Sequence, residues 1–307
     1  MKTTRARAPL RAGVLLALAA CAAGAPPAIT PASAARRGTL FIVGGGTQPE
    51  ALVRDFVALA GGPGHARIAV VPMASEEAEE GGREKVAQLD SLGADAFVLN
   101  VTHEQAETDS VVHLLDGVTG IWFGGGDQLR LTQAIGGTRT LAAMQARYRA
   151  GAVVGGTSAG AAVMSDSMIT GNQRRPEADS VGYYGDEFPR IARGAIQIVP
   201  GFGFLHGAIV DMHFIRRERA NRLLSVVLER PSLIGVGIDE GTAVRVDPDG
   251  RWVVLGKSAA IIYDARHARV TAPQALRLGA DGILVDVLPA GSSYDPRTGR
   301  ATLASAP

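Results

Sequence analysis

The chain has 307 residues, 46% of them hydrophobic and 5% aromatic, which is enough to bury one large core, so we expect one main domain. The 31 lysine and arginine residues nearly balance the 30 aspartate and glutamate residues, and the formal net charge is +1. Basic residues are dispersed apart from the N-terminal segment and a cluster near residues 216–222, which argues against nucleic acid as a partner.

Residues 1–37 are typical of an export signal followed by a linker. Basic MKTTRARAPLR precedes the apolar run AGVLLALAACAAGA, which is too short to span a bilayer comfortably, and small residues follow. We therefore expect the mature protein to be exported: periplasmic, lipid-anchored or secreted.

Two processing sites compete in this segment. Leu18-Ala19-Ala20-Cys21 resembles a lipoprotein box, in which Cys21 would carry a lipid and anchor the protein to a membrane, whereas Ala32-Ser33-Ala34 resembles an ordinary signal-peptidase site. Cys21 is the only cysteine, so the mature domain has no intramolecular disulfide, no CxxC metal site and no thiol nucleophile.

After residue 37, short β-branched runs alternate with amphipathic helical patterns. The spacing predicts strands over 39–46, 66–75, 94–101 and 118–126, and helices from residue 50 and over 83–93. This order predicts an α/β fold over 38–307, a mostly parallel sheet flanked by helices. From about residue 241, two strand-like runs flank an Asp-Pro-Asp-Gly turn and GILVDVLPAG follows, which predicts a terminal antiparallel strand set on the same domain.

Three of the predicted strands end in glycines: VGGG at 43–46, FGGGDQ at 123–128 and VVGGTSAG at 153–160. Ligands of parallel sheets bind outside the carboxyl ends of the strands, so these ends point to one site. The phosphate-loop pattern GxxxxGK[ST] does not occur, and no dinucleotide-binding GxGxxG pattern opens a helix. The glycine-rich strand ends are therefore only weak evidence for nucleotide binding.

The segment Gly156-Thr157-Ser158-Ala159-Gly160 has the G-x-S-x-G form between an apolar strand and a small-residue helix. This context is typical of a nucleophile elbow, with Ser158 as nucleophile and the backbone N–H of Ala159 directed at an oxyanion. We expect the following helix to direct its free amides at the substrate as well. The alternative is a glycine-rich turn with a capping hydroxyl.

A serine nucleophile needs a base, and His213 is the strongest candidate among six histidines. It follows an apolar strand-like run and precedes a helix that carries Arg216, Arg217, Arg219 and Arg222, a pattern that favours a site for an anionic substrate. A structural histidine and a solvated, salt-bridged helix face are the alternatives.

Glu240 is the candidate for the acid that orients this base, because it ends another buried strand, where an unpaired carboxylate would be costly. Side chains alternate along a strand, so Asp239 is expected to point the other way. Glu177, in the loop after the elbow helix, is the fallback acid.

The order Ser158, His213, Glu240 differs from that of the α/β-hydrolases. Together, FGGGDQ, GGTSAGAAVM, DMHFIRRERANRLL and GIDEGTA resemble the cyanophycinase branch of the peptidase E family of serine peptidases, from about residue 38 to the terminal strands. The resemblance implies a class I glutamine amidotransferase-like, flavodoxin-like fold. It also implies an enzyme that hydrolyses the β-linked aspartyl-arginine polymer cyanophycin, releases β-Asp-Arg dipeptides and needs no metal or other cofactor.

The resemblance further implies a Ser158–His213–Glu240 triad, with backbone amides near the GGDQ segment completing the oxyanion hole. The remaining positions that the resemblance assigns to oxyanion or substrate binding are Gly126, Asp127, Gln128, Asp211, Arg217, Arg219 and Arg222. We expect Asp211 to pair with arginyl groups of the substrate and an arginine to bind its carboxylate. The sequence does not supply the oligomeric state, although open α/β domains of this kind often pair as a homodimer.

Two departures from the family pattern put the exact substrate in doubt: Met212 stands where glutamine is usual, and the segment 171–193 looks long. The alternatives are a peptidase E-like enzyme acting on short aspartyl peptides and an inactive, lipid-anchored binding homologue. A glutamine amidotransferase is set aside because those enzymes generally use an elbow cysteine.

Overall fold

The computed structural model describes residues 38–173, 191–275 and 277–304. All of the described residues belong to one compact unit. Cys21, the alternative site at Ala34, the fallback acid Glu177 and most of the segment 171–193 lie outside the described residues. The predicted export segment and the domain boundary at residue 37 therefore stay predictions.

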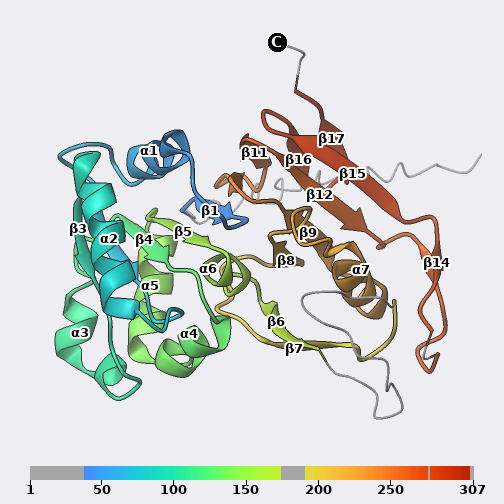
Figure 1. Ribbon diagram of the computed structural model, residues 1–307, viewed down its shortest axis with the longest axis horizontal. Coiled ribbons are helices and arrows are strands. Elements are labelled where there is room, and N and C mark those ends of the chain that lie inside the picture. Colours follow the sequence, from blue (N-terminus) through green and yellow to red (C-terminus); the bar gives the residue numbers. More distant parts are fainter. Residues whose placement is uncertain (1–37, 174–190, 276, 305–307) are drawn as a thin grey trace, which may run out of the picture. The chain divides into compact units, whose positions relative to one another are not determined.

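The larger sheet has a parallel half that supports the site (Figure 1). Its strands pair in the order β1, β5, β4, β2, β3, and each of these pairs is parallel. Their bounds are β1 Leu40–Val43, β2 Arg67–Val71, β3 Asp95–Val98, β4 Gly120–Phe123 and β5 Val153–Thr157. The parallel strands predicted from the sequence are confirmed, each shorter than expected. The glycines that follow β1 and β4 lie outside the strands, and β2 ends before Pro72.

Helices cover both faces of this half. Side chains alternate along β1, so Phe41 packs in one core with α1 and α2, while Ile42 packs in another core with α4, α5 and α6. The helices are α1 Glu50–Leu59, α2 Ala78–Ser91, α3 Asp109–His113, α4 Gln128–Ile135, α5 Arg139–Arg149, α6 Ala159–Ala162 and α7 Ala220–Glu229, with a 3-10 helix at Gln105–Glu107. No helix in the described ranges is long and apolar enough to cross a membrane.

Antiparallel strands extend the same sheet beyond β1. They follow in the order β10 Thr242–Val246, β11 Trp252–Gly256, β16 Ser293–Asp295 and β17 Arg300–Thr302. The predicted hairpin around the Asp-Pro-Asp-Gly turn is β10–β11, closed by the Gly250 amide, which donates to the Asp247 carbonyl at 2.8 Å. The predicted terminal antiparallel set is thus confirmed.

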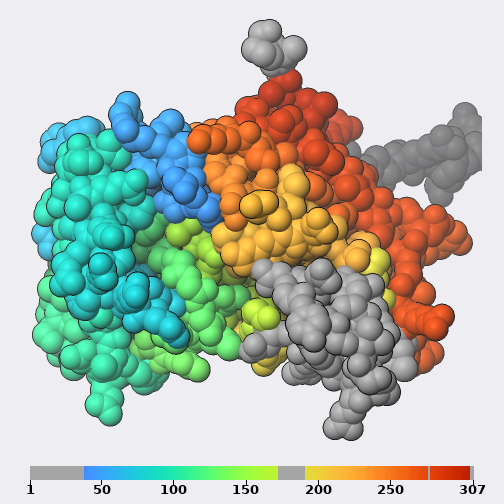
Figure 2. All heavy atoms as spheres, viewed as in Figure 1, coloured from blue at the N-terminus to red at the C-terminus, as the bar shows by residue number. Residues whose placement is uncertain are grey.

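A second sheet carries the other half of the site. Its order is β15 Leu284–Pro289, β12 Ala259–Asp264, β9 Ile234–Ile238 and β8 Ala208–Met212, with β8 and β9 parallel. Helix α7 packs on one face of this sheet, and its gold outer surface is visible in Figure 2. Two short ribbons complete the described strands: β6 Ser167–Gln173 with β7 Ile196–Pro200, and β13 Arg269–Val270 with β14 Ala280–Asp281.

Candidate active site

The elbow around Ser158 is as sharp as its glycines suggest. Ser158 has φ 53° and ψ −113°, a left-handed conformation that costs a non-glycine residue about 1–3 kcal/mol. A Cβ on Gly156 would lie 2.5 Å from the Gly160 carbonyl oxygen, and a Cβ on Gly160 would lie 2.3 Å from that of Phe123. Both flanking positions therefore need glycine, because the obstructing atoms are backbone.

His213 and Glu240 reach Ser158 from the second sheet. The imidazole Nε2 lies 2.9 Å from the Ser158 Oγ, and Nδ1 lies 2.6 Å from the Glu240 Oε1. A carboxylate can only accept, so Nδ1–H donates to Glu240, and Nε2 is left to accept the hydrogen bond of the Ser158 hydroxyl. The structure thus brings the three predicted residues into one hydrogen-bonded chain.

Gly44, Gly45 and Gly46, the glycines after β1, make room for this chain. The Gly44 carbonyl accepts the His213 amide at 2.6 Å. A Cβ on Gly45 would lie 2.3 Å from the His213 Cε1, and one on Gly46 would lie 2.8 Å from a Glu240 carboxylate oxygen. The sequence located this glycine run at the site but did not reveal that it packs against the base and the acid.

Asp239 points away from Glu240, as the alternation along a strand predicts. Its Oδ1 accepts the backbone N–H of Arg216 at 3.0 Å, and its Oδ2 accepts the hydroxyl of Ser258 at 2.8 Å. The choice of Glu240 over Asp239 as the partner of His213 therefore agrees with the geometry.

The environment of His213 favours a neutral imidazole. Burial lowers the pKa of His213 below its ordinary value of 6.5, and the hydrogen bond to Glu240 opposes this by raising the pKa. The positive charge of Arg217 adds a smaller lowering of the same pKa. At neutral pH the ring is therefore unprotonated at Nε2 and able to take a proton.

Asp211 and Arg222, expected to line a substrate cleft, lie in the interior instead. The Asp211 side chain is 0% exposed and accepts two hydrogen bonds from Arg222, one from Nε at 2.8 Å and one from Nη2. Arg219 is also buried, and its Nη1 donates to the Met212 carbonyl at 2.8 Å and lies 3.8 Å from Asp211. A carboxylate without exposed surface cannot meet a substrate, so we correct the expectation and treat this cluster as internal support.

Met212 belongs to the same cluster. Its sulfur lies 3.3 Å from the Arg219 Nη1, and the residue is 4% exposed. The departure from glutamine therefore changes an interior contact. Arg217, whose charge lowers the pKa of His213, is by contrast exposed. Of the three arginines predicted to bind substrate, Arg219 and Arg222 are buried and Arg217 is exposed.

The three predicted residues of the GGDQ segment, Gly126, Asp127 and Gln128, make contacts within the protein. Gly126 faces the Ala74 carbonyl, where a Cβ would lie 2.1 Å away, and the side chain of Asp127 caps α4 by accepting the Leu129 amide at 2.8 Å. The side chain of Gln128 is buried and donates to the Ile169 carbonyl at 2.6 Å.

Gly125, the first residue of the GGDQ segment, was not among the predicted site residues, yet it lies close to the nucleophile. A Cβ there would lie 3.6 Å from the Ser158 Cβ. In the described part of the chain, neither the Gly125 nor the Ala159 amide donates to a backbone carbonyl. Helix α6 spans only Ala159–Ala162, so single amides rather than the aligned dipoles of a long helix would serve an oxyanion here.

A cleft of about 540 Å³ adjoins this loop. Glu76, Glu77 and Arg130 line it together with Gly126 and Asp127. Arg130 pairs with Glu76, so the cleft keeps an excess of negative charge. The sequence showed no signal for Glu76 and Glu77 beyond their position after a predicted strand.

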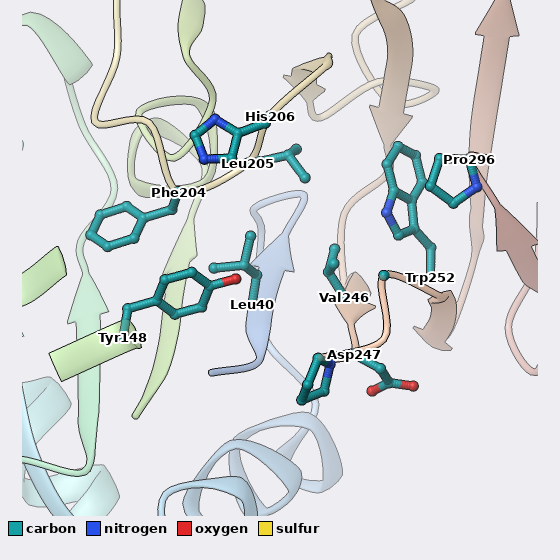
Figure 3. Close-up of a pocket in the computed structure, with 11 residues that line it drawn as sticks. Leu40, Tyr148, Phe204, Leu205, His206, Val246, Asp247, Trp252 and Pro296 are labelled. Atoms are coloured by element: carbon teal, nitrogen blue, oxygen red, sulfur yellow. The ribbon is translucent and has the colours of Figure 1, made fainter. Parts of the chain in front are cut away.

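A separate pocket of about 130 Å³ lies at the other end of β1 (Figure 3). Leu40 lines it at the start of the strand, whereas Val43, at the end, accepts the Ser158 amide at 3.1 Å. Tyr148, Phe204 and Trp252 also line this pocket, which contains none of the three residues of the hydrogen-bonded chain. Among the described residues, no group of three or more His, Cys, Asp and Glu side chains is placed to hold a metal ion.

Comparison with known proteins identifies the family. The model of peptidase family S51 matches residues 40–253. The chain belongs to peptidase family S51. It is therefore a peptidase, a hydrolase as predicted, and a serine-type site fits this family.

The relatives of this S51 peptidase include two cyanophycinases. That of Nostoc sp. is 34% identical over 233 residues, 74% of each chain. That of Geminocystis herdmanii is 32% identical over 274 residues, which cover 85% of this chain and 95% of the relative. A crystal structure of a peptidase from an acI-B1 Actinobacterium has a TM-score of 0.60 at 23% identity, over 85% of this chain and 98% of that one. The predicted family resemblance and the α/β fold class are confirmed.

Proposed function

We propose that this protein degrades cyanophycin to β-Asp-Arg dipeptides with a Ser158–His213–Glu240 triad. The observation that carries the proposal is the hydrogen-bonded chain from Glu240 through His213 to Ser158 at a strained elbow. The cyanophycinase relatives support the choice of polymer. Because the product is a β-Asp-Arg dipeptide, the amide that is hydrolysed joins successive units, and the β-linkage within each unit stays intact.

The first half of the reaction forms an acyl-enzyme. The Ser158 Oγ attacks the scissile carbonyl carbon while Nε2 of His213 takes the hydroxyl proton, and Glu240 stabilises the imidazolium that results. The amides of Gly125 and Ala159 donate to the oxyanion. When the intermediate collapses, His213 returns the proton to the leaving amine and the C–N bond breaks.

The second half uses water. The imidazole removes a proton from a water molecule, whose oxygen attacks the ester carbonyl, and the collapse of the second intermediate returns the proton to Ser158. The carboxylic acid product leaves, and the triad is restored without any other co-reactant.

The charges around Ser158 suit the zwitterionic units of this polymer. Exposed Arg217, close enough to His213 to influence its pKa, can pair with a substrate carboxylate. Glu77 and Asp127 in the adjoining cleft can receive arginyl guanidinium groups, the role that the sequence had suggested for Asp211.

The test is product analysis on insoluble cyanophycin. Purified protein is expected to release β-Asp-Arg, detected by mass spectrometry, and Ser158→Ala is expected to abolish the release. Ser91→Ala, which alters an exposed serine at the end of α2, is the matched control and should retain wild-type activity. Equal release by wild type and Ser158→Ala would contradict the assignment of the nucleophile.

Short aspartyl peptides, tested in parallel, separate the alternatives. Cleavage of these peptides without degradation of the polymer would identify a peptidase E-like enzyme. A folded protein that cleaves neither substrate would favour the inactive binding homologue.

We also propose that the protein is exported and anchored through Cys21. The basic start, the short apolar run and the lipoprotein-like box support this proposal. Cell fractionation should find the full-length chain with the membranes and a Cys21→Ala variant in the soluble exported fraction. Recovery of both in the cytoplasm would contradict export.

A further inference from the structure

The turn between β8 and α7 carries both His213 and Arg217, and its backbone is strained. His213 and Glu218 each have φ 51°, a left-handed value that is unfavourable for residues other than glycine. The turn is closed by the Arg217 amide, which donates to the His213 carbonyl at 2.9 Å, and by the Arg219 amide, which donates to the Phe214 carbonyl at 3.0 Å. Such a conformation persists only where surrounding contacts hold it.

The start of the turn is held by hydrogen bonds to the main chain of two neighbouring segments of the protein. The His213 amide donates to the Gly44 carbonyl at 2.6 Å, and the Phe214 amide donates to the Ile238 carbonyl at 3.2 Å. These bonds join residues 213 and 214 to neighbouring segments. The exposed residues that follow are bonded within the turn, where the Glu218 amide also donates to the Ile215 carbonyl at 3.1 Å.

Asp239 supplies a contact at that exposed part. Its Oδ1 accepts the Arg216 amide at 3.0 Å, and the Ser258 hydroxyl donates to Oδ2 at 2.8 Å, which holds the carboxylate in one orientation. Arg216 is exposed, and this hydrogen bond joins the exposed part of the turn to a neighbouring segment.

We propose that Asp239 is a positioning residue that anchors the 213–218 turn and thereby aligns His213 with Ser158 and directs Arg217 toward the substrate. Adjacent carboxylates at the end of β9 thus have separate tasks: Glu240 binds the imidazole, and Asp239 holds the backbone that carries it. This inference rests on the proposed function, because it assumes that Ser158 reacts through His213.

The test compares Asp239→Ala with Asp239→Asn. Alanine removes the acceptor for the Arg216 amide, whereas the asparagine side-chain oxygen can still accept it. The matched control is Asp249→Ala, since the Asp249 Oδ1 accepts the Arg251 amide at the same distance of 3.0 Å in the β10–β11 hairpin. The rate of Ser158 modification by phenylmethanesulfonyl fluoride is measured first, because it reports on the Ser158–His213 pair. The kcat and KM on cyanophycin are measured second, and the KM reports on Arg217.

Asp239→Ala is expected to slow Ser158 modification about tenfold or more and to raise KM, because small displacements of reacting groups cost large factors in rate. Asp239→Asn should recover most of both quantities, and Asp249→Ala should match the wild type. Wild-type values for Asp239→Ala, or equal losses in Asp239→Ala and Asp249→Ala, would overturn the proposal, as would losses that asparagine does not recover.

If Asp239→Ala fails to fold, Ser258→Ala takes its place. It frees the carboxylate to rotate and is expected to give a smaller loss of the same kind, and unchanged values would overturn the proposal. Failure of the proposed function is distinguishable, because the wild type itself would then leave cyanophycin intact. If Ser158 is modified in that case, the comparison of modification rates still decides the role of Asp239.

Discussion

An alanine at position 45 would place a methyl group against the imidazole of His213. Its Cβ would lie 2.3 Å from Cε1 and 2.4 Å from Nε2 of the ring. Carbon atoms in contact normally lie about 3.5–4.0 Å apart, so the ring would have to move by about 1.2 Å. The ring is held on one side by Ser158 and on the other by Glu240, and it cannot move that far while keeping both bonds.

The expected effect of Gly45→Ala is a loss of activity of about 10²-fold, because a displacement of about 1 Å in a catalytic group costs that order of rate. Alanine is also strained at the φ of +101° that Gly45 adopts, which adds about 1–2 kcal/mol of destabilisation.

Gly151→Ala separates the two effects. Gly151 has φ +111° and nothing within 4 Å of the position that a Cβ would occupy, so it shares the backbone strain without the collision. Cyanophycin degradation and thermal unfolding are measured for both variants. We expect both variants to lose similar amounts of stability and only Gly45→Ala to lose activity. A folded Gly45→Ala protein as active as Gly151→Ala would refute the claim that this glycine makes room for the base.

Further predictions concern the charged groups of the site. Glu240→Gln should lower kcat about 10³–10⁴-fold with little change in KM, since the amide cannot stabilise the imidazolium, and a wild-type kcat would contradict this role. Activity should fall with decreasing pH through the pKa of His213, below 6.5, because only the neutral ring accepts the proton. Arg217→Gln removes a charge that lowers this pKa and should move the acid limb of a kcat–pH profile upward; an unmoved limb would contradict the electrostatic argument. Asp211→Asn should cost about 3–5 kcal/mol in urea unfolding by leaving Arg222 buried without its charge partner, whereas a raised KM at unchanged stability would restore Asp211 to the cleft.

The parts of the site that could be predicted are those whose function imposes a local pattern. Ser158 lies in a G-x-S-x-G pentapeptide in which Gly156 is required by the carbonyl of Gly160, four residues later, so the elbow could be predicted from a local pattern. The contact that requires Gly160 comes from Phe123 on a distant strand. Strand alternation predicted that Glu240 and Asp239 point to opposite sides, and the family resemblance indicated Glu240 as the partner of His213. The parallel strands follow from short apolar runs, and those of β1 and β4 are followed by glycines.

The parts that could not be predicted depend on contacts between distant segments. Asp211 and Arg222 are separated by a strained turn and part of a helix, and no local pattern shows that they pair in the interior. The glycines after β1 resemble a ligand loop until the structure shows the two side chains packed against them.

Helix α2 illustrates the same limit in the fold. It begins at Ala78, five residues before the predicted start at residue 83. The prediction was late because Gly81 and Gly82, in the first turns of the helix, resemble a loop in the sequence. A Cβ on Gly82 would lie 3.1–3.2 Å from Val98 and Pro72, so this glycine permits close packing of helix on strand. The residue that looks like a helix breaker is thus explained by a tertiary contact.

The most direct test of the account is to map the modification of the protein by phenylmethanesulfonyl fluoride with and without cyanophycin. We predict a single modified residue, Ser158, identified by peptide mass spectrometry, with the reaction slowed by cyanophycin and abolished in His213→Ala. Modification at another residue, or modification of Ser158 that neither cyanophycin nor the loss of His213 affects, would contradict the account.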